Sequence, residues 1–251
     1  MIGTLLNMLT VAVGSALGLF VGDRLPERIQ QSVVTGLGLV TFLVGIDNAQ
    51  QTGNIIIPLL AVGSGVIVGE LLDLDAALTR FGGWLQARFG GQAAEDAPGV
   101  ARAEGALDPR SRFINGFVTA SLVFCIGPLT FIGSLQDGMT GDFELLAIKS
   151  VMDGFASLAF ASAMGVGVAF SIITILVVQG GLALLGALGG SVMTDPMIAE
   201  MTATGGLLLM GLSLVLLDLK RPRMANFLPA LVIAPLIVVV AEWLGIAVYP
   251  L

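Results

Sequence analysis

The sequence predicts an all-α membrane protein with about eight transmembrane helices, related to one another by an inverted-topology internal repeat. Three observations lead to this fold class: the composition, the length of the apolar segments, and the distribution of basic residues between them. Of the 251 residues, 56% are hydrophobic and only 12% are charged, whereas a soluble domain carries about 25% charged residues. Such a chain cannot cover itself with polar surface in water, but in lipid it needs none.

Eight apolar segments are long enough to cross a bilayer, which takes roughly 17–25 mostly apolar residues per helix. Gly or Pro interrupts the fourth and the eighth segment. The predicted spans are Ile2–Val21, Gln31–Ile46, Ile55–Leu72, Phe113–Ser134, Leu145–Met164, Ala169–Leu188, Met201–Leu217 and Phe227–Ala247.

The basic residues support the number eight. Ten of the eleven Lys and Arg residues fall in the loops after the first, third and seventh spans, and only Lys149 lies elsewhere. With eight spans, all three loops lie on one side of the membrane, which the positive-inside rule makes cytoplasmic. Both termini are therefore expected outside.

One long polar stretch interrupts the spans. Its first part, Leu74–Phe89, has apolar residues at helical spacing and is expected to continue the third span as an amphipathic helix. Residues 90–111 are rich in Ala, Gly and charge and are predicted to form a flexible cytoplasmic loop. Since this loop is too short to be a domain, residues 1–251 are predicted to form a single transmembrane domain.

Four pairs of spans share sequence. Leu9–Gly22 aligns without gaps to Ile173–Gly186, which pairs span one with span six. Similar matches pair span two with seven, three with eight and four with five. Every pair is separated by an odd number of spans, so its members run in opposite directions, as in the inverted repeats of many secondary transporters. The alternative is chance similarity among Gly- and Leu-rich helices. The further matches are Thr35–Leu39 with Thr204–Leu208, Asn54, Pro58 and Glu70 with Asn226, Pro229 and Glu242, and Asn115–Phe117 with Asp153–Phe155.

Gly127 and Pro128 predict a break inside the fourth span. Proline removes a backbone donor and clashes with the preceding turn, so the freed backbone groups must find partners in protein, water or a ligand. Transporters hold ions and substrates at such breaks; the alternative is a packing kink satisfied by Thr130 and neighbouring helices. The candidate ligands at and beyond the break are Gly127, Pro128, Thr130, Ser134, Gln136 and Asp137.

The fifth span contains an ionisable pair, Lys149 and Asp153, which share a helix face at i, i+4. Ionisable residues inside a span are costly and usually face the protein interior, so Asp153 is the strongest single candidate. Its repeat partner is Asn115, and Asp137 is expected to lie against the pair. The alternative is an interfacial ion pair that only fixes the depth of the helix.

The middle of the sixth span contains Gln179, which is either a contact between helices or a ligand contact. The chain has no His and one Cys, so it offers no His-based relay and no Cys-rich metal site. No phosphate-binding loop or nucleophile elbow is present in the sequence. The sequence therefore predicts no enzyme, no cofactor and no nucleic-acid partner, and leaves a metal unassigned.

Several motifs resemble a bacterial membrane family catalogued as domain of unknown function 554. The resemblance covers essentially the whole chain and implies a prokaryotic cytoplasmic (inner) membrane protein without implying an activity. The motifs are Ile2–Asn7, Gly69–Leu72, Gly127–Pro128, Gly133–Gly138 and Lys149–Phe155.

The functional prediction is a small secondary transporter of an ion or small solute, working by alternating access at the helix breaks of spans four and five. Two alternatives stay open. The same helices could line an ion channel, or the protein could be a non-transporting membrane scaffold. The partners expected are the lipid bilayer, an unknown ion or solute and, through the Gly-rich helix faces, a second copy of the chain.

Overall fold

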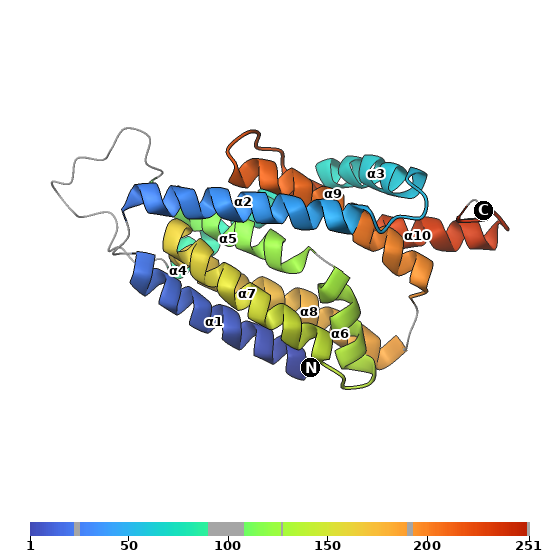
Figure 1. The fold of residues 1–251 in the computed structure, drawn as a ribbon, viewed down its shortest axis with the longest axis horizontal. Helices are drawn as coiled ribbons and strands as arrows, with labels where there is room; N and C mark the ends of the chain where they lie inside the picture. The colour runs from blue at the N-terminus through green and yellow to red at the C-terminus, as the bar shows by residue number, and fades with distance from the viewer. Residues whose placement is uncertain (23–25, 90–107, 127, 190–192, 250–251) are drawn as a thin grey trace.

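The computed structural model describes residues 1–22, 26–89, 108–126, 128–189 and 193–249, which form a bundle of helices (Figure 1). Six of the predicted spans are confirmed as single helices or as a helix preceded by one 3₁₀ turn. The bounds are α1 Ile2–Gly22, α2 Glu27–Ala49, α3 Ile56–Leu72, α4 Leu74–Phe89, α5 Pro109–Cys125, α6 Pro128–Met139, α7 Glu144–Met164, η2 Val166–Phe170, α8 Ser171–Gly189, α9 Asp195–Leu216, η3 Met224–Phe227 and α10 Pro229–Trp243.

The remaining two predicted spans are bent. The axes of α3 and α4 differ by 51°, and those of α5 and α6 by 64°. Asp73 ends α3 in the left-handed conformation with φ 49°, so α4 turns away instead of continuing the third span straight. Six helices of the described residues are long and apolar enough to cross a membrane, or eight crossings if each bent pair is one span.

Local sequence explains where two other helices begin. Asp108 accepts a hydrogen bond from the Ser111 amide at 2.5 Å, and Pro109 occupies the first turn of α5. Pro196 lies in the first turn of α9, so α9 begins at Asp195, six residues before the predicted span. Residues 90–107 of the predicted loop lie outside the described residues.

The helices form two groups with α5 between them (Figure 1). In one group α1 packs along α7, and α8 packs along α6; in the other, α2 packs along α9, and α3 along α10. Glycines bring α1 and α7 together, because Gly14 faces the Gly154 carbonyl and Gly18 faces the Leu158 carbonyl with no room for a side chain. Four residues further along α1 correspond to four residues further along α7, so the two helices run parallel.

Leucine and valine side chains cover the outside of the bundle. On α1 the exposed residues recur every fourth position at Leu5, Leu9, Val13 and Leu17, each more than half exposed. Water would oppose such a continuous apolar stripe on a folded surface, whereas lipid accepts it. The exposed stripe and the apolar helix lengths together indicate a membrane protein.

The end of α1 and the start of α2 lie at one end of the bundle, away from both chain termini (Figure 1). At that end the Gln30 amide donates to the Gly22 carbonyl at 3.1 Å, and Arg112 donates to the Ala163 carbonyl at 3.1 Å. The basic residues of two predicted cytoplasmic loops are therefore at the same end as the C-termini of α1 and α7.

Candidate binding site beside the broken helix

The predicted break in the fourth span is confirmed. Helix α5 ends at Cys125, Ile126 is extended, and α6 begins at Pro128. The Thr130 hydroxyl donates to the Phe124 carbonyl at 3.1 Å, so it satisfies one of the carbonyls that the break releases. Gly127, the other predicted ligand at the break, lies outside the described residues.

Lys149 and Asp153 form an ion pair inside the bundle. Their side chains are only 7% and 8% exposed, and the Asn7 amide of α1 donates to Asp153 Oδ2 at 2.9 Å. Asp153 is the tenth of the 21 residues of α7, which places it close to the middle of the helix. This depth favours an internal site over an interfacial pair that only positions the helix.

The broken helix packs against the helix that carries the ion pair. The Phe124 ring, at the end of α5, meets the Phe160 ring of α7 with centroids 6.3 Å apart. Phe160 is seven residues, roughly 10 Å along α7, from Asp153. Two features that the sequence suggested independently, the broken helix and the charged pair, therefore lie on neighbouring helices.

Asp137 does not join the Lys149–Asp153 pair as expected. Its Oδ2 accepts from the Gly3 amide at 3.1 Å, and its Oδ1 from the Met1 amino group at 2.8 Å. A carboxylate is favourable there because the first amides of a helix lack partners and carry the positive end of its dipole. Asp137 thus caps α1, which sequence spacing could not reveal because the two groups are 134 residues apart.

Four buried polar side chains of α1, α6 and α8, helices that pack against one another, have atoms without a hydrogen-bond partner among the described residues. They are the Thr4 and Ser134 hydroxyls, the Asn7 carbonyl oxygen and both amide atoms of Gln179. Each of these side chains is at most 1% exposed. Buried polar groups are nearly always paired, so a group of unpaired ones indicates a place for a ligand or water.

Helix geometry relates these groups in two pairs, Asn7 with Gln179 and Thr4 with Ser134. Val11 and Ile175 belong to one buried cluster, and α8 runs antiparallel to α7 and α1. Asn7 and Gln179 each lie one turn from that layer, in the direction of the N-terminus of α1. Ser134 is one turn from Asp137 and Thr4 is next to Gly3, so the contact between Asp137 and Gly3 brings these two to the same level.

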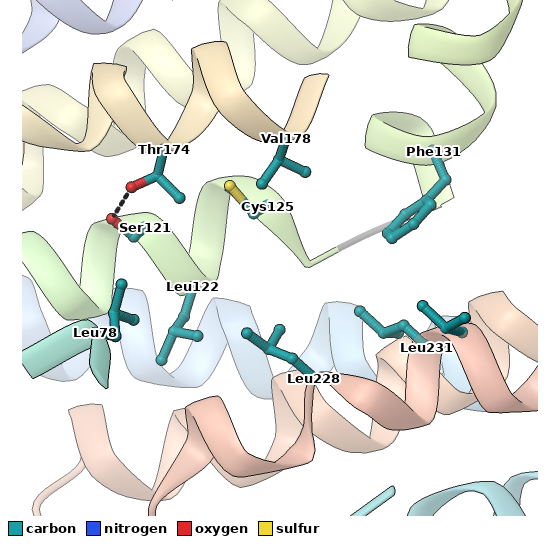
Figure 2. A pocket seen from close by; sticks show the side chains of 10 residues that line it. Leu78, Ser121, Leu122, Cys125, Phe131, Thr174, Val178, Leu228 and Leu231 are labelled. Atoms are coloured by element: carbon teal, nitrogen blue, oxygen red, sulfur yellow. Dashed lines mark hydrogen bonds between the residues drawn. The ribbon is translucent and has the colours of Figure 1, made fainter. Parts of the chain in front are cut away.

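An apolar cavity of about 220 Å³ lies on the other side of the break (Figure 2). Figure 2 shows Cys125 and Phe131 flanking the break, with Leu231 of α10 opposite them. The polar side chains in its wall, Ser121 and Thr174, bond each other at 2.9 Å. Neither Lys149 nor Asp153 lines this cavity.

Two predicted site residues lie apart from this region. Asn115 is exposed on α5, far along the helix from the break. Gln136 donates to Asp142 at 2.8 Å in an exposed turn after α6. The structure therefore gathers Thr130, Ser134, Lys149, Asp153 and Gln179 around the break and leaves Asn115 and Gln136 outside.

Sequence reasoning missed another buried carboxylate, Glu200 of α9. Glu200 is fully buried; its Oε1 accepts from the amides of Gly53 and Asn54 at 2.9 and 3.2 Å, and its Oε2 from the Thr52 hydroxyl at 2.7 Å. The predicted seventh span began at Met201 and excluded it. The helix-start pattern at Asp195-Pro196 is the signal that includes Glu200 in the helix.

The fold and the buried charges define a class: a multi-pass α-helical membrane protein with an ionisable pair inside its bundle. The chain belongs to the family DUF554, described as "protein of unknown function", whose family model matches residues 2–239. The family resemblance seen in the sequence motifs is therefore confirmed.

Two relatives match over nearly their whole length. The uncharacterized protein YqgA of Escherichia coli (strain K12) is 31% identical over 233 residues, covering 93% of this chain and 94% of the relative. The uncharacterized membrane protein YdfK of Bacillus subtilis (strain 168) is 24% identical over 250 residues, covering 98% and 99%. No solved structure gives a significant match.

Proposed function

We propose that the protein is a small secondary transporter that binds an ion or small solute beside the break between α5 and α6. The observation that carries the proposal is the buried Lys149–Asp153 pair with Asn7 against it, whose carbonyl oxygen has no hydrogen-bond partner among the described residues. Leaving such an atom unpaired costs about 1–3 kcal/mol. A protein with a purely structural role would gain stability from apolar side chains at these positions.

In this proposal the closed ion pair is the unloaded state. Asp153 is the carboxylate that meets the solute or coupling ion, and Lys149 is its gate. The break allows α6 to move against α5, because only the Thr130–Phe124 hydrogen bond joins the two helices across the break among the hydrogen bonds of the described residues. Alternating access then needs the two helix groups to rock about α5.

The helix contacts support the inverted repeat that the sequence suggests. The symmetry of the repeat exchanges span one (α1) with span six (α8), and span four (α5 and α6) with span five (α7). It therefore converts the α1–α7 contact into the α8–α6 contact, and both contacts are extensive. It leaves the α2–α9 and α3–α10 contacts in place, and these are also extensive. The proposed orientation has both termini outside and the basic loops in the cytoplasm of a prokaryotic cell.

The first test is a thermal-shift screen of the purified protein against ions and small metabolites. It is followed by counterflow in proteoliposomes with whichever solute stabilises. A ligand at a hundred times its dissociation constant should stabilise the fold by about 2.7 kcal/mol. The double variant Lys149→Met with Asp153→Asn should abolish both signals.

Ser15→Ala is the matched control for this test. Ser15 is also fully buried and has no hydrogen-bond partner in the described part of the chain, but it lies eight residues along α1 from Asn7, a distance of roughly 12 Å. Uptake that survives in the double variant would overturn the proposal.

The closed Lys149–Asp153 pair also suits a second candidate, a membrane scaffold in which the pair only holds α7 in place. A scaffold should show no stabilising solute and no uptake. Large single-channel currents would instead identify a channel.

A further inference from the structure

We infer that the transported solute is a small zwitterion of the α-amino acid type, which binds by entering between Lys149 and Asp153. The inference rests on the proposed transport function and names the substrate of the same site. Two properties of the region carry it: its net charge and its inventory of unpaired hydrogen-bonding atoms.

The charges favour a solute that is itself neutral overall. Lys149 and Asp153 cancel, so the buried region has no net charge before binding. A lone cation would leave one uncompensated positive charge inside the bundle, and a lone anion one negative charge, at a cost of several kcal/mol. A zwitterion places its carboxylate against the Lys149 ammonium and its own ammonium against the Asp153 carboxylate, so every charge stays paired.

The unpaired atoms match the remaining hydrogen bonds of such a solute. The Asn7 carbonyl oxygen is an acceptor beside Asp153, to which the same side chain already donates, and it can accept a second N–H of an ammonium group. Gln179 offers a free donor and a free acceptor, and the hydroxyls of Ser134 and Thr4 offer either. Neutral amides and hydroxyls of this kind suit an organic zwitterion.

The broken helix adds dipoles of the same two signs. The N-terminus of α6 carries partial positive charge, and the C-terminus of α5 carries partial negative charge. Broken helices in transporters present such ends to anionic and cationic groups. The break therefore supplements the Lys149–Asp153 pair without adding net charge.

The first probes are the smallest α-amino acids. The Lys149 and Asp153 side chains are buried and closed on each other, so a solute that enters between them must be small. Glycine and alanine are therefore the probes of choice.

The test is a thermal-shift titration of the full-length protein in detergent with five probes at equal ionic strength. Glycine and alanine carry both charges. Propionate carries only the carboxylate and ethylamine only the ammonium group. Sodium chloride supplies an alkali cation. We expect a saturable rise in Tm with glycine or alanine and none with the single-charge probes.

Two variants distinguish this site from binding elsewhere. Gln179→Leu removes only unpaired atoms, so it should leave the Tm without ligand unchanged or raised while weakening the zwitterion at least tenfold. Ser15→Ala should leave the affinity for the zwitterion unchanged. An affinity unaffected by Gln179→Leu would overturn the assignment of the site.

The outcomes also separate this inference from the proposed function. Stabilisation and counterflow with only sodium, propionate or ethylamine would overturn the zwitterion and leave a transporter. If no probe shifts the Tm but another solute from the wider screen does so and is taken up, the zwitterion alone fails. If no solute of any class binds or is taken up, both proposals fail.

Discussion

Asp153 and Glu200 are both carboxylates buried in the helix bundle, yet their surroundings differ in kind. Asp153 has a cationic partner, Lys149, and lies among polar side chains whose remaining atoms are unpaired. Glu200 has no basic partner among the described residues, and both of its oxygens are occupied by Thr52, Gly53 and Asn54. A partner of Asp153, Asn7, therefore keeps an unpaired oxygen, whereas both oxygens of Glu200 are in use.

The comparison separates a binding region from a structural one. Glu200 ties the loop between α2 and α3 to α9, and two of its three donors are backbone amides that no ligand would replace. At Asp153 the partners are the side chains of Lys149 and Asn7, which can rotate away so that a solute takes their place. Burial of a carboxylate by itself therefore does not mark a binding site; what distinguishes Asp153 is that movable side chains, one with an unpaired oxygen, hold it.

The largest expected effect concerns the Lys149–Asp153 pair. Lys149→Met alone leaves an unpaired buried carboxylate and should destabilise the fold by about 3–5 kcal/mol. Adding Asp153→Asn should restore much of that loss, because no buried charge remains. Detergent-solubilised thermal unfolding measures both; equal stability of the single and double variants would contradict a buried pair.

A smaller effect is expected at Glu200. Glu200→Gln replaces one acceptor oxygen with an amide that faces a donor, so we expect a loss of about 1–3 kcal/mol. Hydrogen exchange should rise at residues 52–54, while binding of any solute at Asp153 stays unchanged. Altered solute affinity in this variant would show that the two regions are coupled and that Glu200 is more than a tie.

The hydrogen bond across the helix break should contribute less. Thr130→Val keeps the shape of the side chain and leaves the Phe124 carbonyl unpaired, which should cost about 1 kcal/mol. If the break moves during transport, the variant should change the uptake rate more than the solute affinity. Paired measurements of uptake and thermal shift can separate these two effects.

The smallest effect concerns pH and Tyr249, which lies beyond α10. Partial burial, and then the negative charge of Glu200, raise the pKa of the Tyr249 phenol above its usual 10.0. The folded state therefore holds this proton more tightly than the unfolded state, so its contribution to stability is complete below about pH 10 and is lost as pH rises through the folded pKa. The change in the Tm difference between wild type and Tyr249→Phe from pH 9 to pH 11 measures this contribution. We expect that change to be smaller when both proteins also carry Glu200→Gln.

The sequence by itself determined the membrane class, the helices and the site of the break. The Pro128 ring and the i, i+4 spacing of Lys149 and Asp153 act within one or two helical turns, and apolar length is a property of one continuous segment, so all three can be read from neighbouring residues. The same reasoning shortened α9 and missed Glu200, because a carboxylate at the end of an apolar run looks solvated when its partners are unknown.

Only the tertiary structure decided which polar groups meet. Asn7 reaches Asp153 across 146 positions, Thr52 reaches Glu200 across 148, and Gly3 reaches Asp137 across 134. These contacts depend on how the glycine-lined faces of the helices pack, and helix packing is set by the whole bundle. The unpaired atoms at Asn7, Ser134 and Gln179 depend on the same packing, since only the assembled bundle removes water from them without supplying partners.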